Sequence, residues 1–281
     1  MKNTVNVIDD LSLSTTSENS QDYIKDGLLH CHLCNTPKEY RAKFGPDYKK
    51  VCCLCDCETK IRNQEQKKQE LKKQKCYIER LTVQGIQDKA LRSASFEKAD
   101  GSNQKNMQRA QSYVQKFRED FYPQGSGLLF WGDTGRGKTY TAACIANALI
   151  DKGIPVLKTD FSTISNQLYA AQDKNATLAS FNRYDLLVID DLGVERKSDY
   201  MLENMFIIID QCYKNNKPMI ITTNITLQML GNPTSIVQSR LYDRILEKCI
   251  PLFFDGPNRR DEKRTRNFEH AKKVFGAEES E

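Results

Sequence analysis

GLLFWGDTGRGKTY, residues 127–140, is the stretch that decides the fold of this chain. An apolar run, Gly127–Trp131, leads into a loop with three glycines, and the loop ends in Lys138 and Thr139. The segment Gly132–Thr139 matches the pattern G-x-x-x-x-G-K-[ST] at every fixed position, in which backbone N–H groups surround phosphate oxygens. The positive end of the helix predicted for residues 139–152 would face the same anion. The stretch therefore predicts a phosphate site between a strand and a helix.

Each residue type in this loop has a chemical task. The glycines let the backbone curl around the phosphates, Lys138 contributes a positive charge there, and Thr139 offers its hydroxyl to Mg²⁺. The residues that we expect to line the nucleotide site are Gly132, Asp133, Thr134, Gly135, Arg136, Gly137, Lys138, Thr139 and Tyr140.

Apolar runs and amphipathic segments alternate on the C-terminal side of the loop. Further strands are predicted at 156–159, 185–190, 219–223 and 250–254, and helices at 161–172, 200–213 and 235–247. Strands that alternate with helices indicate a parallel sheet covered by helices on both faces. The predicted fold class is therefore α/β.

Polar side chains stand where two of these strands end. Asp190 and Asp191 close a buried apolar run, and two adjacent carboxylates there are costly unless they meet a cation. We expect Asp190 to bind Mg²⁺, largely through water, and Asp191 to polarise the attacking water. Asn224 follows the next strand and could orient that water, although an asparagine after a strand is also ordinary turn chemistry.

The composition is that of an ordinary globular protein with a small positive charge. The chain has 281 residues, of which 39% are hydrophobic and 28% charged, and a formal net charge of +5. Basic residues gather at 60–75 and 259–273, which suits phosphate backbones or acidic partners, although a solvated helix face gives the same pattern. The start lacks the pattern of a secretory signal, and no apolar run reaches the ~20 residues of a membrane span. We therefore expect a cytoplasmic protein without a membrane partner.

Together these motifs resemble the AAA+ ATPases, and more narrowly the DnaC/DnaI-type helicase loaders of bacteria and phages, which are close to the IstB transposition helpers. The resemblance covers about residues 96–266 and implies an AAA+ P-loop NTPase fold with ATP and Mg²⁺ as cofactors. It also implies ATP hydrolysis that is weak and stimulated by DNA or a partner. It rests on these residues in this order: Lys138, Thr139, Asp190, Asp191, Asn224 and Ser239–Arg244.

The resemblance assigns a role in trans to one arginine. It implies that Arg240 is an arginine finger on the neighbouring subunit's ATP, so that the chain forms a homo-oligomer through the AAA+ domain. For Arg244 we expect instead a salt bridge with Asp243 or Glu247.

A second arginine is expected to contact the chain's own nucleotide. The family's sensor arginine follows the last strand and matches Arg259, with Arg260 as the alternative. The expected catalytic residues are therefore Lys138, Asp190, Asp191, Asn224, Arg240 and Arg259.

The resemblance also implies a surface for single-stranded DNA. The loader positions that line the central pore match Ser198 and Tyr200, and Phe161 or Tyr169 could contribute from the preceding helix. A tyrosine offers a face on which a base can stack, and a serine can bond phosphate. The alternative for Tyr200 is that it begins a helix and packs its ring on the core.

Six cysteines form a cluster near the N-terminus: Cys31, Cys34, Cys52, Cys53, Cys55 and Cys57. Pairs at CxxC spacing are typical of structural zinc sites, and a segment this short cannot bury a core without such a staple. Spacing alone favours Cys52 with Cys55 as the second pair. The loaders that this chain resembles often end their cluster in CxC, which matches Cys55 and Cys57.

We take four of these thiols as the zinc ligands, namely Cys31, Cys34, Cys55 and Cys57. His30 and His32 are further candidates, and a redox site or thiols without a role are the alternatives. Four parts are then expected: a disordered tail at 1–25, a zinc-binding, helicase-docking domain at 26–58, a basic helical linker at 59–95, and an AAA+ ATPase domain with a basic C-terminal tail at 96–281.

The resemblance implies an ATP-dependent loader of the replicative helicase. Such a protein binds ATP with Mg²⁺, single-stranded DNA and the DnaB-type hexameric helicase during initiation of replication. One alternative is an IstB-like transposition helper, which would act on duplex DNA. Another is an adaptor that uses the nucleotide as a switch without hydrolysing it.

Overall fold

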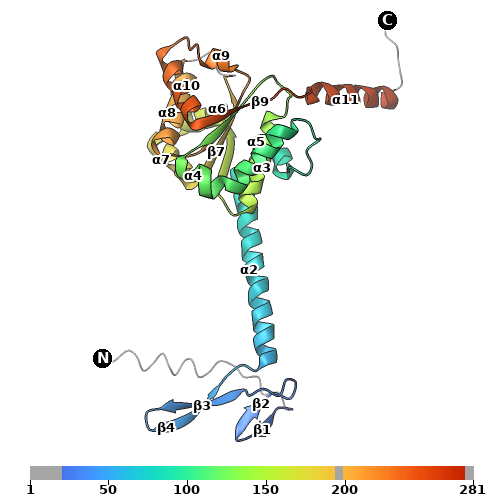
Figure 1. Ribbon diagram of the computed structural model, residues 1–281, viewed down its shortest axis with the longest axis vertical. Coiled ribbons are helices and arrows are strands. Elements are labelled where there is room, and N and C mark those ends of the chain that lie inside the picture. The colour runs from blue at the N-terminus through green and yellow to red at the C-terminus, as the bar shows by residue number, and fades with distance from the viewer. Residues whose placement is uncertain (1–20, 194–198, 276–281) are drawn as a thin grey trace. The chain divides into compact units, whose positions relative to one another are not determined.

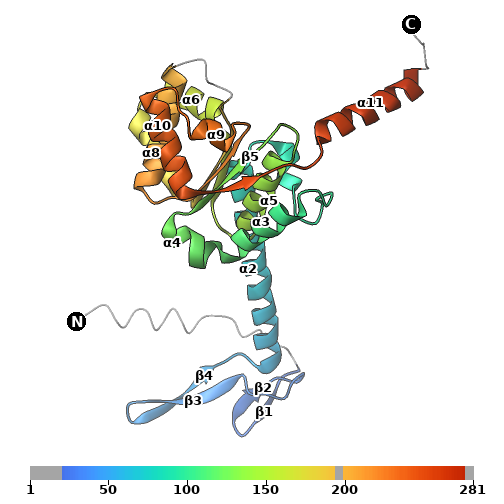
Figure 2. The same cartoon turned by 45° about the horizontal axis from the view of Figure 1, so that its top comes forward.

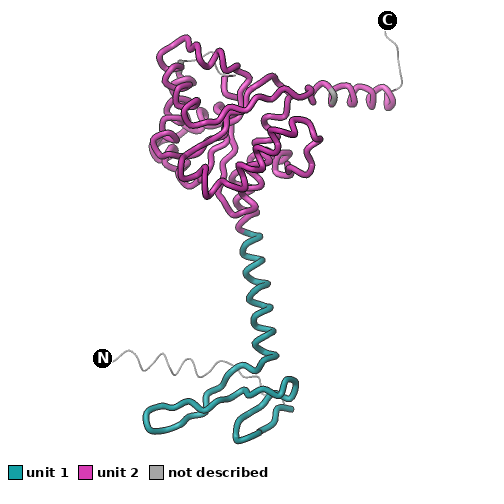
Figure 3. The backbone as a smooth tube through the Cα atoms, viewed as in Figure 1, with its two compact units in different colours: residues 1–76 teal, residues 77–281 magenta. Residues whose placement is uncertain are grey.

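The computed structural model describes residues 21–193 and 199–275, and the chain divides into two compact units, residues 1–76 and 77–281 (Figure 3). Within those described ranges we found no helix that combines the length and the apolar character needed to cross a membrane. The predicted disordered tail lies outside the described residues up to residue 20, and Tyr23–Lys25 form a strand.

The N-terminal unit consists of two antiparallel hairpins followed by a helix. β1 (Tyr23–Lys25) pairs with β2 (Leu28–His30), and β3 (Glu39–Phe44) pairs with β4 (Asp47–Cys52). Gly45 has φ +64° in the turn between β3 and β4, a conformation that glycine adopts without strain. The buried residues between positions 21 and 58 are His30, Cys31, Lys38 and Cys55. None of them is a large aliphatic or aromatic side chain, so hydrophobic burial contributes little here.

Helix α2 (Asp56–Gly85) runs from the first unit into the second. Every residue from 59 to 77 is exposed, and the sequence there is almost entirely polar. The last two turns are different, since Leu81 and Gly85 are buried in the second unit.

The second unit contains a five-stranded parallel sheet with the order β6-β7-β8-β5-β9. Its strands are β5 (Gly127–Trp131), β6 (Val156–Asp160), β7 (Leu186–Leu192), β8 (Met219–Thr223) and β9 (Cys249–Phe253). The strands match the predicted ones to within two residues at each end. The α/β fold with a parallel sheet is therefore confirmed.

Helices cover both faces of this sheet (Figures 1 and 2). On one face, α3 (Gln104–Lys116), α5 (Lys138–Asp151) and the end of α2 pack on alternate strand residues such as Phe130 and Val188. On the other face, α6 (Phe161–Ala170), α8 (Asp199–Lys214) and α10 (Ile236–Lys248) pack on the residues between them, such as Leu129 and Ile189. The period of two along each strand thus builds two separate cores.

The remaining elements are short, apart from the last helix. They are the 3₁₀ helices η1 (Lys89–Ser93) and η3 (Phe181–Arg183), the π-helical turn η2 (Phe117–Phe121), and the helices α4 (Tyr122–Gln124), α7 (Lys174–Ser180), α9 (Leu227–Leu230) and α11 (Arg259–Phe275). Most of the segment that we predicted as a basic tail is therefore the helix α11.

Candidate nucleotide and metal sites

The phosphate loop joins β5 to α5 and uses its glycines for backbone shape. Gly132, Gly135 and Gly137 have φ values of +135°, +77° and +90°. A Cβ on Gly135 would lie 1.9 Å from Oδ1 of Asn258, so a side chain there would also collide. Helix α5 begins at Lys138 without a side-chain cap, so its first N–H groups are left for an anion.

Lys138 connects the loop with the end of β8. Its ammonium donates to the carbonyls of Gly132 and Asp133 at 2.6 and 2.7 Å, and to Oδ1 of Asn224 at 2.7 Å. Burial lowers the pKa of Lys138, and the charge of Asp191 opposes this effect. Two predicted site residues, Lys138 and Asn224, are therefore in direct contact.

Asp190 lies beside Thr139, as expected for a shared magnesium site. The hydroxyl of Thr139 donates to Oδ1 of Asp190 at 2.9 Å. Two residues that the sequence analysis missed also hold this carboxylate: Thr222 of β8 donates to Oδ1 at 2.6 Å, and Lys158 of β6 forms an ion pair with Oδ2 at 3.0 Å. A carboxylate and a hydroxyl oxygen side by side are hard donors of the kind that Mg²⁺ prefers, so these residues fit the ion.

Asp191 has a left-handed backbone conformation, which is unusual for a residue other than glycine. Its φ is +57°, and its N–H donates to the hydroxyl of Thr222 at 2.9 Å. The β7–β8 register shifts between Ile189 and Leu192, which makes room for this conformation. Burial raises the pKa of Asp191, and the charge of Asp190 adds to the rise. A carboxylate with a raised pKa at a strained position suits a base, as predicted for this residue.

A cavity of about 440 Å³ opens over the loop. Its lining includes predicted residues together with Leu91, which the sequence analysis did not single out. Both candidate sensor arginines line it, and Arg259 is also paired with Asp100 at 2.6 Å. The lining residues are Leu91, Thr134, Gly135, Arg136, Gly137, Lys138, Thr139, Tyr140, Asp191, Asn224, Arg259 and Arg260.

The two arginines of α10 have different surroundings. Arg240 is exposed and forms no ion pair with any residue in the part of the chain that the structure describes. Arg244 forms an ion pair with Asp210 at 2.7 Å and lies over the ring of Phe206, 4.5 Å from its centroid. The expected partners of Arg244 on its own helix were therefore wrong, because α8 packs beside α10 and offers a closer carboxylate.

The predicted DNA contacts can be followed only in part. Ser198 lies outside the described residues. Tyr200 is 40% exposed, and its ring meets that of Tyr169 edge-on, with 6.4 Å between the two ring centroids. The ammonium of Lys174 lies 5.9 Å from the centroid of the Tyr200 ring. Phe161 is fully buried and was wrongly suggested, because the first residue of α6 faces the core.

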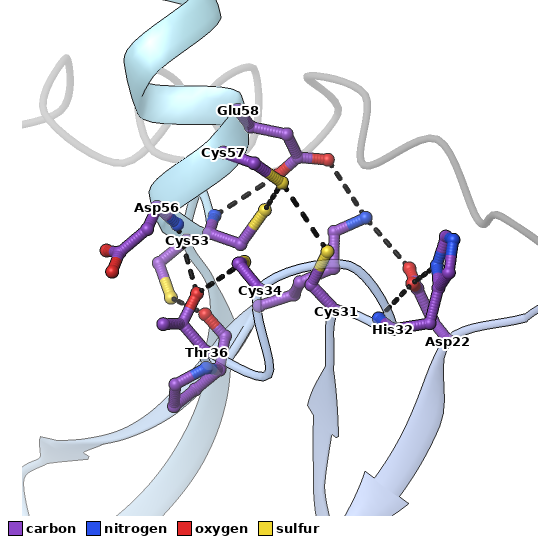
Figure 4. Close-up of polar contacts among 12 residues, drawn as sticks. Asp22, Cys31, His32, Cys34, Thr36, Cys53, Asp56, Cys57 and Glu58 are labelled. Carbon is purple, nitrogen blue, oxygen red and sulfur yellow. Dashed lines mark hydrogen bonds and ion pairs between the residues drawn. The ribbon is translucent and has the colours of Figure 1, made fainter.

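The cysteine cluster brings together four thiols in the N-terminal unit (Figure 4). The sulfur atoms of Cys31, Cys34, Cys55 and Cys57 all lie within 4.8 Å of one another, which fits a tetrahedral metal ion. The other two cysteines lie apart, since Cys52 is exposed and Cys53 donates to the carbonyl of Pro37 at 3.5 Å.

Polar residues surround these thiols. The hydroxyl of Thr36 lies 3.0 Å from the sulfur of Cys34 and is the main reason that the pKa of this thiol is lowered to about 5. His30 contacts the carbonyl of Leu28 at 3.0 Å. His32 contacts Asp22, also at 3.0 Å. Neither histidine is part of the four-thiol group, although His32 forms a second group of possible metal ligands with Asp22 and Cys31.

The fold and the phosphate loop between β5 and α5 define an AAA+ P-loop protein, with its nucleotide site at the C-terminal edge of a parallel sheet. The chain belongs to the family of IstB-like ATP binding proteins, whose family model matches residues 50–267.

Several relatives are described as helicase loaders, which confirms the resemblance to the DnaC/DnaI-type proteins. The replicative helicase loader DnaI of Bacillus subtilis is 23% identical over 284 residues, covering 92% of this chain and 88% of that protein. A crystal structure of the DnaC helicase loader matches with a TM-score of 0.51 and 27% identity, covering 59% of this chain and 99% of that one. An insertion sequence ATP-binding protein of Sinorhizobium fredii is 30% identical, but over only 36% of this chain and 35% of its own length.

Proposed function

We propose that this protein is an ATP-dependent loader of a replicative DNA helicase in the bacterial cytoplasm, encoded by a bacterium or a phage. The observation that carries the proposal is the similarity to DnaI, because it extends over 92% of the chain and so includes both compact units. A match limited to the ATPase unit would support only a shared fold.

The nucleotide site supports ATP binding and hydrolysis. Lys138 donates to two loop carbonyls and is positioned to exchange them for phosphate oxygens. Thr139 and Asp190 would hold Mg²⁺, which supplies charge neutralisation at the phosphates when bound. Asp191 accepts a proton from the attacking water, and Asn224, which accepts a hydrogen bond from Lys138, orients that water.

Assembly would complete this site with a residue from a second copy of the chain. Arg240 is exposed and does not line the cavity of its own chain. A neighbouring subunit's nucleotide would give this arginine an anionic partner, which the described residues of its own chain do not provide. We therefore assign Arg240 as the arginine finger and Arg259 as the sensor within the chain.

Single-stranded DNA would bind beside the start of α8. The exposed rings of Tyr200 and Tyr169 offer stacking faces, and Lys174 adds a positive charge next to them. Aromatic faces with a neighbouring cation are the usual means of holding unpaired bases without sequence preference. Ser198 completes this surface in the proposal.

The N-terminal unit would hold one zinc ion and dock the helicase. The zinc ligands are the four clustered thiols, and the helicase surface is the set of apolar side chains that this unit leaves exposed. The most exposed of them between positions 21 and 58 are Ile24, Leu33, Tyr40, Phe44 and Tyr48. So many exposed apolar residues on so small a unit are expected of an interaction surface.

A second candidate function is that of an IstB-type transposition helper. The family match and the insertion sequence ATP-binding relative favour it. That relative, however, aligns with only 36% of this chain, whereas DnaI aligns with both units.

The two candidates differ in the DNA and the partner that they need. We would mix the purified protein with the replicative helicase of its host, single-stranded circular DNA, and ATP or ADP. A loader raises helicase bound to the circle in the presence of ATP, and Lys138→Ala abolishes the gain. Preference for duplex DNA with no helicase captured would contradict the loader function and favour the transposition helper.

A further inference from the structure

Strand β6 carries a lysine on the face that packs against α5, within the apolar sequence VLKTD. Lys158 is 8% exposed, and Val156 and Val188 beside it on this face are buried. Its backbone is fixed on both edges, since it pairs with Val188 on β7 and bridges to Ile86 on the other side. An ammonium group held in such surroundings is costly unless an anion meets it.

That anion is the carboxylate of Asp190. The Nζ atom of Lys158 lies 3.0 Å from Oδ2, while Oδ1 accepts hydrogen bonds from Thr139 and Thr222. Both oxygens of the carboxylate are therefore bonded to groups of the protein itself. Asp160 pairs with Asp190 in the parallel register, so Lys158, two residues earlier on β6, reaches forward along the same face.

We propose that Lys158 is a positioning residue of the nucleotide site. Its ammonium is a counter-ion that holds the carboxylate of Asp190 in place when no metal is bound. The same positive charge opposes the binding of Mg²⁺ to that carboxylate. The inference rests on the proposed function, because it requires ATP and Mg²⁺ to bind at the phosphate loop. Neither Lys158 nor Asp190 is among the residues that line the cavity. Lys158 therefore acts through Asp190, which accepts a hydrogen bond from the lining residue Thr139.

The charge of Lys158 has two consequences of opposite sign. It repels a divalent cation that shares Asp190, and Coulomb repulsion over such a short range corresponds to about tenfold in affinity. It also attracts the anionic nucleotide, so ATP should bind more tightly in the absence of Mg²⁺. Loss of the charge should therefore lower the Mg²⁺ concentration at which ATP binding is half-maximally enhanced. It should also weaken the binding of ATP in the absence of metal.

The test compares variants of the full chain by fluorescence titration with an N-methylanthraniloyl ATP analogue, first in EDTA and then at increasing MgCl₂. Lys158→Met removes the charge and nearly keeps the length of the side chain. Lys158→Arg keeps the charge. Lys217→Met is the matched control, since Lys217 is a buried lysine that donates to the carbonyls of Phe181 and Tyr184, away from the cavity.

We expect the Mg²⁺ midpoint of analogue binding to be about tenfold lower in Lys158→Met than in the unsubstituted protein. The same variant should bind the analogue more weakly in EDTA. Lys158→Arg and Lys217→Met should keep the Mg²⁺ dependence of the unsubstituted protein. If the role of Lys158 were purely structural, Lys158→Met would lower thermal stability, as Lys217→Met does, without shifting the Mg²⁺ midpoint. If Lys158→Met does not fold, Lys158→Gln, which can still donate to Asp190, gives the same comparison.

Two failures can be told apart. An unchanged Mg²⁺ midpoint in folded Lys158→Met or Lys158→Gln, or an equal shift in Lys217→Met, overturns the role of Lys158. Failure of the unsubstituted protein to bind the analogue at any Mg²⁺ concentration would instead contradict the proposed nucleotide function.

Discussion

Removal of the zinc ion that we propose for the cysteine cluster should unfold the N-terminal hairpins and leave the second compact unit intact. The buried residues between positions 21 and 58 are two cysteines, a histidine and a lysine, so hydrophobic burial cannot hold this segment together. In zinc-finger peptides, a structural zinc ion with four protein ligands contributes about 10–16 kcal/mol to folding near neutral pH. We expect a loss of that order, which exceeds what the hairpins could supply without the metal.

The perturbation is Cys55→Ser, or a strong chelator, and the matched control is Cys52→Ser. Cys55 is buried with its sulfur 3.1 Å from that of Cys57, whereas Cys52 is exposed and lies outside the four-thiol group. Amide hydrogen exchange would be followed in the β3–β4 ladder and at the N–H of Cys53, which donates to the carbonyl of Lys38. These amides should lose protection in Cys55→Ser alone.

The same samples give metal content and ATP affinity. We expect about one zinc per chain in the unsubstituted protein and in Cys52→Ser, and far less in Cys55→Ser, with equal ATP affinity in all three. Protein that contains no metal, or hairpins that stay protected in chelator, would refute the reasoning. Equal damage from Cys52→Ser would show that the ligand set is a different one.

Three further predictions concern the ATPase unit. Arg240→Ala should keep ATP affinity and lose most turnover, and mixing it with Lys138→Ala should restore part of the rate; absence of rescue at every ratio argues against a shared site. Tyr200→Ala should weaken single-stranded DNA binding by roughly 1–3 kcal/mol per stacked base in anisotropy titrations with ATP, and equal binding to Tyr200→Phe and Tyr200→Ala would exclude stacking. Thr222→Val leaves the N–H of Asp191 without its acceptor, so chemical denaturation should show a loss of about 1–3 kcal/mol, whereas unchanged stability and turnover would mean that the bond is dispensable.

Local patterns were sufficient for most of the AAA+ fold, because its strands are apolar runs with glycine, proline or asparagine near their ends. The order of the strands could not be predicted in this way. β5 is bonded to β8 and β9, which follow it by about a hundred residues, and only packing of the whole sheet decides that arrangement. Helix α3 was missed because most of its residues are polar, although Met107, Ala110 and Val114 recur at helical spacing and are buried.

The nucleotide site was predictable where its residues stand at strand ends or in the loop. Lys138, Asp190 and Asn224 each follow an apolar run, and the C-terminal ends of parallel strands meet at one edge. The partner of Arg244 was not predictable, because Asp210 lies on another helix. In the cysteine cluster, spacing alone favoured Cys52, and the folded hairpins leave its side chain exposed instead.

The role of Lys158 could not be predicted from sequence motifs, because it depends on the register between β6 and β7. In the sequence it interrupts an apolar strand and carries no motif. Once β6 is paired with β7, however, it lies on the same face as Asp190 and two positions behind it, which is the reach of an extended lysine side chain. A charged residue on the inward face of a buried strand must meet an opposite charge, and the nearest one here is the carboxylate that the nucleotide site also needs. In the role that we propose for Lys158, β6 therefore competes with the metal for Asp190 through this one side chain.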